Sequence, residues 1–453
     1  MAGRVQLATS GPQDIFFTED PEYTYFIKNF KKHTNFSTFF VDLDVDGEVE
    51  FGNNLRCTIP QNQGDLLKTL SFKIELSPIN QSLVGGTDGT RYNESIGHAM
   101  FEYVELLIGG QLIQRIPRNF LQIYSELYVT QTNQTPLATL IGKPPGELSG
   151  SKVNGSDILG YLPYATADTK YFVDIPFYFY NNPELAIPLC AIDKQEVEVV
   201  FKLANSADCY HYQETSGGYL RRHGIEIKNL IKSLKVTAEM VCLDEPERAK
   251  LQSKKIDYIV TQIQENTFDP LPREDNHNTF SEAIYRLNFV NPVKELFFVI
   301  QKVITVPISS RWVSAFDWDH AEQILNTGSS HSSAIPMSRY INYENLHHLS
   351  LTLDGETILD EDTGSLINLR AVQSGIHHSR TPLYRRFYSY SFSLEPERWY
   401  PTGQKNFSFI KNQNIKIKIN PHVGFGDRGL RVYALSYNIL RIENGISKIL
   451  FIQ

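Results

Sequence analysis

The sequence is poor in cysteine and contains no long hydrophobic run. Its four cysteines lie far apart in the 453 residues and form no C-x-x-C pair: Cys57, Cys190, Cys209 and Cys242. Such spacing argues against a disulfide framework or a zinc site and is typical of reduced thiols. No apolar segment approaches the roughly 18 residues that a membrane span requires. The N-terminus also lacks a basic segment followed by an apolar one, so we expect no signal peptide and folding in the cytosol.

Sequence motifs of common enzymes are absent or incomplete. The pattern His-Glu-x-x-His, the pattern Gly-x-Ser-x-Gly and the phosphate-binding loop do not occur. Residues 424–429 match G-x-G-x-x-G, but a strand-like segment follows where a dinucleotide site needs a helix. The acidic stretch 42–47 starts like a calcium loop, yet Asn53 occupies the twelfth position, where a bidentate acid belongs. We therefore predict a protein that is not an enzyme and has no catalytic residue, cofactor or metal site.

Charge and composition narrow the class of protein further. The chain has 43 Lys and Arg against 51 Asp and Glu, a net charge of −8. This balance argues against a surface devoted to nucleic acid, which needs clustered Lys and Arg. The 41% of hydrophobic residues can fill sizeable cores, and the length fits two large all-β domains or three ordinary ones.

Short strand-like segments separated by turn-rich loops dominate both halves of the chain. The clearest expected strands are 66–76, 101–108 and 231–243 in the first half, and 256–263, 292–299 and 430–442 in the second. The apolar spacing of 119–129 predicts a helix, and Gly109-Gly110 predicts a hairpin turn. Loops are expected at 130–165, 204–223, 306–345 and 354–386. Many short strands with few helices indicate β-sandwiches or jelly rolls.

A charged segment separates the two halves. Asp244 is a capping acid, Pro246 falls in the first turn, and strong helix formers follow, so a short linker helix is expected. We predict an N-terminal arm at 1–35, a first domain at 36–243, a linker helix at 244–255 and a second domain at 256–453.

The first 35 residues alternate short apolar anchors with turn residues, which favours an extended arm over a folded domain. Such an arm either docks on a partner or lies against its own body. Its candidate contact residues are bulky or basic: Ile15, Phe16, Phe17, Tyr23, Tyr25, Phe26, Phe30, Lys31 and Lys32.

Several motifs occur together in an order shared with one family. Residues 172–203 combine an aromatic run, Asn-Asn-Pro-Glu-Leu-Ala-Ile-Pro-Leu and an acidic alternation that ends in Phe-Lys-Leu. The arm carries Gln-Leu-Ala and Lys-Lys-His-Thr-Asn-Phe, and the second half carries Tyr-Ser-Phe-Ser-Leu at 390–394 and Tyr-Asn-Ile-Leu-Arg-Ile at 437–442. Over nearly its whole length the chain resembles the major capsid proteins of nucleocytoplasmic large DNA viruses, such as those of phycodnaviruses, iridoviruses and marseilleviruses.

The resemblance implies an all-β fold of two tandem antiparallel eight-stranded jelly rolls, with short helices in the loops and the linker. It also implies a structural virion protein, made in the host cytoplasm or viral factory, whose homotrimers form pseudo-hexagonal capsomers of an icosahedral shell. Its partners would be neighbouring capsomers and minor capsid proteins beneath the shell, close to an internal viral membrane that it does not span and without direct contact to nucleic acid. The arm residues would face the capsid interior. A minor or penton-type capsid paralogue, or a jelly-roll lectin or glycoside hydrolase, remains an alternative.

Six Asn-x-Ser/Thr sequons occur in the sequence. Without a signal peptide, ordinary secretory glycosylation is not expected. Four sequons fall in expected loops and are the candidates for modification by another route: Asn80, Asn93, Asn133 and Asn154.

Overall fold

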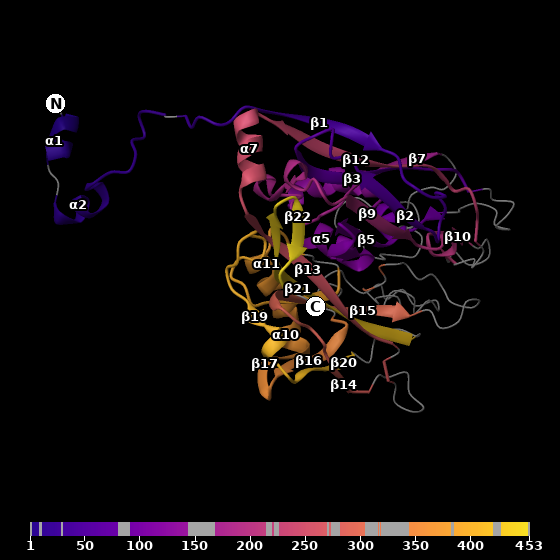
Figure 1. Cartoon of the computed structure of the whole chain (residues 1–453). Helices are drawn as coiled ribbons and strands as arrows, with labels where there is room; N and C mark the ends of the chain where they lie inside the picture. Colours follow the sequence, from indigo (N-terminus) through magenta and orange to yellow (C-terminus); the bar gives the residue numbers. More distant parts are fainter. Residues whose placement is uncertain are drawn as a thin grey trace. The chain divides into compact units, whose positions relative to one another are not determined.

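The computed structural model describes most of the chain (Figure 1). The described residues are 2–8, 11–28, 30–79, 91–143, 168–213, 220–221, 226–269, 271–272, 281–303, 316, 318, 344–381, 385–419 and 427–451. Two compact units are present, Met1–Phe36 and Ser37–Gln453, and we call them the arm and the body.

The arm contains two short helices, α1 (Ala2–Ala8) and α2 (Pro12–Thr18). The expectation of a fully extended arm is therefore wrong for these residues. Pro12 fits the first turn of a helix, and the Asp14 carboxylate accepts a hydrogen bond of 2.9 Å from the Gly11 N–H, which caps the helix start.

Eight strands of the first half of the body form two four-stranded antiparallel sheets. Sheet 1a has the order β1-β12-β3-β7, and the two-residue strand β8 also pairs with β3. Sheet 1b has the order β2-β9-β5-β6. The strands of sheet 1a are Phe36–Leu43, Ile231–Leu243, Leu66–Leu76 and Thr169–Asp174, and those of sheet 1b are Asn54–Ile59, Val197–Leu203, Phe101–Ile108 and Gln111–Pro117. Strict alternation, as in β2 with buried Leu55, Cys57 and Ile59, directs one face of each sheet into a shared core.

The second half repeats this arrangement. Sheet 2a has the order β13-β21-β15-β18, and sheet 2b has the order β14-β20-β16-β17. Their strands are Ile256–Phe268, Asp427–Glu443, Pro292–Val303 and Phe387–Ser391, then Ala283–Arg286, Gln413–Ile419, Leu346–Leu353 and Glu356–Asp362. Numbered along the chain, the eight main strands of each half pair as 1-8-3-6 and 2-7-4-5. This repeated order confirms the predicted double jelly roll.

Smaller elements fill the connections. The helical segments of the body are α4 (Ile96–Ala99), α5 (Arg118–Leu127), η1 (Gln131–Asn133), α6 (Gln134–Ile141), η4 (Pro183–Leu185), η5 (Leu189–Ala191), η6 (Ser206–Asp208), α7 (Glu245–Ser253), α10 (Thr363–Ile367), η7 (Asn368–Gln373), α11 (Ser374–His377) and η8 (Phe407–Phe409). The short strands are β4 (Arg91–Tyr92), β8 (Ile187–Pro188), β10 (Tyr210–Gln213), β11 (Leu220–Arg221), β19 (Lys405–Asn406) and β22 (Ile446–Ile449). Helix α7 lies within the predicted linker, but the body is one compact unit, so the domain boundaries stay a prediction.

Three predicted loops contain regular structure that was not expected. The first part of 130–165 forms α6, 204–223 includes β10, and 354–386 includes β17 and the helices α10 to α11. In the last segment, Asp362 caps α10 by accepting hydrogen bonds from the backbone N–H groups of Gly364 and Ser365. Buried Leu366 and Leu369 then hold this helix against the second core, so tertiary packing overrides the weak local helical pattern.

The long connections of both jelly rolls leave from one end of the strands. In the first half, Leu76 at the end of β3 pairs with Thr169 and Ile231, the starts of β7 and β12. In the second half, Val303 at the end of β15 pairs with Asp427 at the start of β21. We call this end the loop end. The glycine turn at 109–110, with φ of 58° and 77°, helix α7 and the start of β1 lie at the opposite end, the arm end.

Sheet 2a is buried on both faces. On β15, Phe297 and Val299 pack with the core of the first half, whereas Leu296, Phe298 and Ile300 pack into the second core. The uninterrupted apolar run at 296–300 is the sequence signal of such a sheet, because a strand with one wet face alternates instead. The first half thus uses the outer face of sheet 2a as its docking surface.

Candidate functional site

The junction between the two jelly rolls holds a cluster of buried charges. We call Glu94, Glu126, Lys143, Arg380 and Arg385 the junction cluster. Glu126 lies near the end of α5, and Lys143 follows Gly142, whose positive φ of 71° ends α6. The two arginines come from the segment that follows α11 in the second half.

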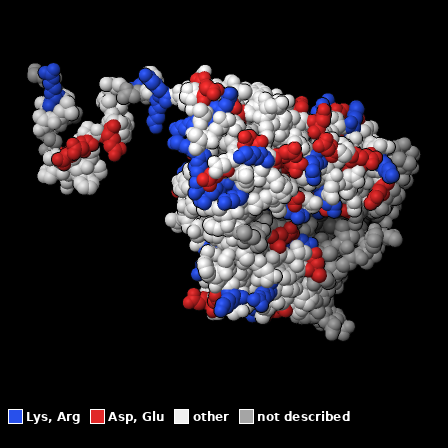
Figure 2. All heavy atoms as spheres, viewed as in Figure 1, with Lys and Arg blue, Asp and Glu red and all other residues white. Residues whose placement is uncertain are grey.

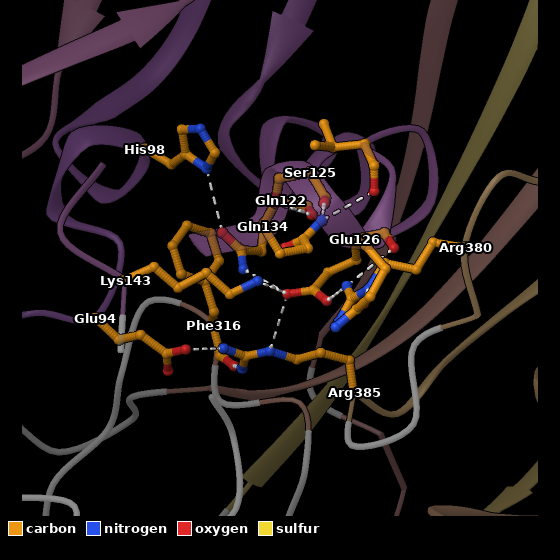
Figure 3. Close-up of polar contacts among 12 residues, drawn as sticks. Glu94, His98, Gln122, Ser125, Glu126, Gln134, Lys143, Phe316, Arg380 and Arg385 are labelled. Atoms are coloured by element: carbon orange, nitrogen blue, oxygen red, sulfur yellow. Dashed lines mark hydrogen bonds and ion pairs between the residues drawn. The ribbon is translucent and has the colours of Figure 1, made fainter. Parts of the chain in front are cut away.

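Glu126 is the centre of this cluster (Figure 3). Lys143 Nζ donates to Glu126 Oε1 at 2.5 Å, and Arg380 Nη1 donates to Glu126 Oε2 at 2.6 Å. Arg385 Nε lies 3.8 Å from Glu126 Oε1, and Arg385 also forms an ion pair with Glu94. The side chains of Lys143 and Glu126 are only 3% and 2% exposed. One carboxylate of the first half therefore holds cations from both halves out of contact with solvent.

The cluster fixes the charge state of its members. Burial alone would raise the pKa of Glu126, but Lys143, Arg380 and Arg385 outweigh burial and lower the pKa to about 2. Burial lowers the pKa of Lys143, and the attraction of Glu126 opposes this effect. Burial also lowers the pKa of His98 to about 4, so its ring is neutral at pH 7.

A second buried group of charges crosses the same junction. His378 Nε2 donates to Glu295 Oε1 at 2.7 Å, and His378 Nδ1 lies 3.5 Å from Glu397. Burial alone would lower the pKa of His378, but these two carboxylates raise it to about 9. Tyr128, from the end of α5, donates from its hydroxyl to Glu295 Oε2 at 3.3 Å. A protonated histidine directly after α11 therefore links the second half's connection between β17 and β18 to β15, and its ring contacts Tyr128 of the first half.

Apolar contacts surround these charges. The rings of Phe120 on α5 and Phe297 on β15 meet edge to face with centroids 5.8 Å apart. Asn119 Nδ2 donates to the Tyr433 hydroxyl at 2.9 Å, and Gln262 Nε2 donates to the Ile113 carbonyl at 2.9 Å. General acid–base catalysis needs a group that changes its charge near neutral pH. Glu126 stays ionised and His98 stays neutral at that pH, and the contacts named above join the two jelly rolls.

The predicted arm residues face solvent within the single chain. All seven apolar candidates are exposed, from 45% for Ile15 to 95% for Phe26, and Lys31 and Lys32 are exposed as well. Ile15, Phe16 and Phe17 lie on α2, whereas the other candidates follow it along the chain. Within the arm, the Tyr23 hydroxyl donates to the Tyr25 hydroxyl at 2.6 Å. The arm thus carries apolar surface without a cover of its own, and its contact role stays a prediction.

The sequons differ in their surroundings. Asn80 and Asn154 lie outside the described residues. Asn93 is fully buried and donates from Nδ2 to the Asp208 carbonyl, an arrangement that argues against a glycan at this position. Asn133 is exposed at the end of η1 and has room for one. The role of the four sequons as modification sites stays a prediction.

Other candidate sites from the sequence have structural explanations. Asp42, the first residue of the stretch that resembles a calcium loop, lies on β1. Its carboxylate accepts hydrogen bonds from Lys73 Nζ and Thr237 Oγ1, both at 2.7 Å. The glycine-rich stretch 424–429 lies partly outside the described residues, and β21 begins at Asp427. Among the described residues, no group of three or more His, Cys, Asp and Glu side chains is arranged to hold a metal ion. No helix in the described part of the chain is long and apolar enough to cross a bilayer.

Sequence reasoning did not find the junction cluster. Glu126 and Arg380 are 254 positions apart, so no local spacing could connect them. One signal was available, because Glu126 is the one carboxylate of α5 and lies next to Leu127, an apolar position of the expected helix. A carboxylate among core positions needs a buried cation, but the sequence does not say which one.

Comparison with known proteins gives consistent matches over both halves. Residues 24–240 match a family described as major capsid protein N-terminus, and residues 247–447 match one described as large eukaryotic DNA virus major capsid protein. The chain is 28% identical to the major capsid protein of Pyramimonas orientalis virus and 24% identical to that of Phaeocystis pouchetii virus, over 98% of each chain.

Solved structures agree on the fold. A chain of the PBCV-1 virus capsid superposes with a TM-score of 0.68 at 20% identity, covering 95% of this chain and all of that one. The Faustovirus major capsid protein superposes with a TM-score of 0.66 at 13% identity, covering 98% and 96% of the two chains.

Proposed function

Because the chain belongs to the family of large eukaryotic DNA virus major capsid proteins and is a structural protein of the virion capsid, we propose that three copies form one capsomer. Each copy supplies two jelly rolls of the same topology, so three copies supply six similar lobes. Six such lobes make a pseudo-hexagonal block that can tile an icosahedral shell together with neighbouring capsomers.

One observation supports a particular orientation of this block in the shell. The long connections of both jelly rolls leave from the loop end, whereas the arm joins β1 at the arm end. Loops tolerate variation and form the outward, recognisable surfaces of many proteins. We place the loop end on the outside of the shell and the arm end on the inside.

The arm then contacts minor capsid proteins beneath the shell. Its exposed Phe16, Phe17 and Phe26 are anchors that would gain cover in such a contact, since large apolar groups in water favour burial. Lys31 and Lys32 add positive charge next to these anchors. An arm of this kind works by binding another protein and needs no chemistry of its own.

Deletion of residues 1–30 tests this role. Purified capsomers of the shortened chain should still contain three chains, with a mass somewhat below the roughly 155 kDa of three full-length 51.8 kDa chains, because the arm and the body are separate units. Particles made in cells that express the full set of capsid proteins should become rare. The triple variant Phe16→Ser, Phe17→Ser, Phe26→Ser should have the same defect, whereas Phe409→Ser, at an 81% exposed position of the body, should not. Undiminished particle assembly after the deletion would overturn the assignment.

The proposal also includes where the protein is made and what lies next to it in the virion. The protein is made in the host cytoplasm or viral factory, lies next to an internal viral membrane without spanning it, and makes no direct contact with nucleic acid. It acts as a building block and not as an enzyme. Of the sequons in the described residues that were candidates, only exposed Asn133 is retained as a modification site.

A further inference from the structure

The junction inside one chain follows a simple rule. The first jelly roll contributes the helix α5, which follows its fifth strand, and the segment 176–185, which follows its sixth strand. The second jelly roll contributes the outer face of sheet 2a, where Phe297 contacts Phe120 and Leu435 lines a cavity of about 80 Å³ together with Phe177 and Tyr178. Connections of one jelly roll thus pack on the outer face of the 1-8-3-6 sheet of the next.

The second jelly roll has the same connections, and in the single chain one part of them faces the junction while another part is uncovered. Its fifth strand leads into α10, η7 and α11, where Val372 and Ile376 lie about one turn apart and are 51% and 66% exposed. Its sixth strand leads into the segment that contains Leu394, which is 77% exposed. His377 Nδ1 lies 3.1 Å from the Leu394 carbonyl oxygen, so these residues form one surface. We call Val372, Ile376 and Leu394 the apolar patch.

The matching receptor surface is also uncovered. It is the outer face of sheet 1a, the counterpart of the buried outer face of sheet 2a. Phe40 on β1 is 69% exposed there. Around it lie ion pairs between Lys73 and Asp42, and between Lys68 and Glu239, each at 2.7 Å. Figure 2 shows positive and negative side chains interspersed over the region where β1, β12 and β3 lie in Figure 1.

We propose that the apolar patch of one copy docks on the outer face of sheet 1a of the next copy, in the manner in which α5 and 176–185 dock on sheet 2a within the chain. This inference rests on the proposed trimer and names the surfaces that build it. Each chain carries the apolar patch on its second jelly roll and the receptor face on its first jelly roll, so the contact between copies is head to tail. A head-to-tail contact closes into a ring when its rotation allows, and three copies give six jelly rolls that are joined by alternating internal and intermolecular junctions.

Charge substitutions in the patch test the inference against a matched control. Ile376→Glu places a carboxylate in the proposed contact, whereas Ile284→Glu makes the same change at a 65% exposed position on sheet 2b. We expect Ile376→Glu to raise the concentration at which the trimer dissociates by about tenfold or more, the effect typical of a central contact residue. Ile284→Glu should leave that concentration unchanged. Leu394→Glu, at a second patch position, should behave as Ile376→Glu does, and circular dichroism should show native secondary structure in all three variants.

Mixing two defective variants tests the head-to-tail geometry. Phe40→Glu damages the receptor face and keeps the patch, whereas Ile376→Glu damages the patch and keeps the receptor face. Equal amounts of both should form a pair of two chains, about 104 kDa by light scattering, that neither variant forms alone. A contact between identical surfaces would give no such rescue.

The outcomes separate this inference from the proposed trimer. A wild-type chain that is monomeric at high concentration would overturn the trimer itself. A trimeric wild type with trimers of unchanged stability in Ile376→Glu and Leu394→Glu would overturn the docking surface and leave the trimer standing. A mixture that shows no species of two chains would overturn the head-to-tail pairing.

Discussion

Replacing Glu126 by Gln should be among the most damaging single changes in the body. The side chain keeps its shape, but the junction cluster loses the carboxylate that balances three cations. Lys143 and Arg380 then lose an ionised acceptor at 2.5 and 2.6 Å, and Arg385 loses a carboxylate 3.8 Å from its Nε while its ion pair with Glu94 stays. The side chains of Lys143 and Arg385 are only 3% and 2% exposed, so their charges cannot be solvated without opening the junction.

The magnitude follows from two independent arguments. The pKa of Glu126 falls from 4.5 to about 2, a change that corresponds to about 3 kcal/mol of favourable interaction with the ionised form. Breaking a buried ion pair by removal of one partner typically costs about 3–5 kcal/mol. We therefore expect Glu126→Gln to lower the free energy of unfolding by about 3–5 kcal/mol.

Urea titration of purified protein, followed by near-ultraviolet circular dichroism, measures this loss. The control is Glu395→Gln, because Glu395 also pairs with an arginine, Arg398 at 2.7 Å, but both side chains are more than half exposed. Exposed pairs contribute at most about 1 kcal/mol. Removing a cation as well, in Glu126→Gln with Lys143→Met, should recover part of the loss. A Glu126→Gln midpoint as close to wild type as that of the control would refute the account of the junction as a charge lock.

Two further predictions concern the same junction. The pKa of His378 is raised from 6.5 to about 9, so the stabilising effect of its charge is fully present below pH 6.5 and is lost as pH rises through about 9. Urea titrations should show the free energy of unfolding falling by about 3 kcal/mol across this range, and His378→Gln should flatten this pH dependence. An unchanged slope in His378→Gln would count against the histidine as the cause. Phe297→Ala should cost about 3–5 kcal/mol through the cavity left beside Phe120, whereas Leu394→Ala, at a 77% exposed position, should change stability by less than about 0.5 kcal/mol in the monomer.

The sequence predicted the strands well where their periodicity was strong. Strands β3, β5 and β12 begin and end at the expected residues, because alternation with a polar face marks both the strand and its core side. Helix α5 was found for a similar reason, since its apolar residues recur at helical spacing. The α10 to α11 segment was mistaken for a loop, because its buried Leu366 and Leu369 are too few to reveal a helix without knowledge of the core that they enter.

The junction could be predicted far less well than the strands. His377 and His378 are adjacent in a segment expected to be a loop, and nothing local indicates that His378 is buried against Glu295 while His377 is only half-buried. The contact with Glu295 spans 83 positions, and that between Arg385 and Glu94 spans 291. Long-range partners of this kind depend on how two jelly rolls dock, which is a property of their surfaces and not of any window of sequence.

The two halves share a topology but differ in the outer face of the 1-8-3-6 sheet, and the difference has a physical reason. Sheet 2a meets its partner within the same chain, so the contact forms during folding and can be apolar, as with Phe297 and Leu435. In the proposed assembly, the outer face of sheet 1a is exposed to solvent until a second copy binds to it. A large apolar face would promote aggregation during that time, whereas paired charges such as Lys73 and Asp42 keep it soluble and still present a patterned surface. A junction that forms during folding therefore favours buried ion pairs and aromatic rings. A contact that forms later between copies favours ion pairs around a few apolar side chains.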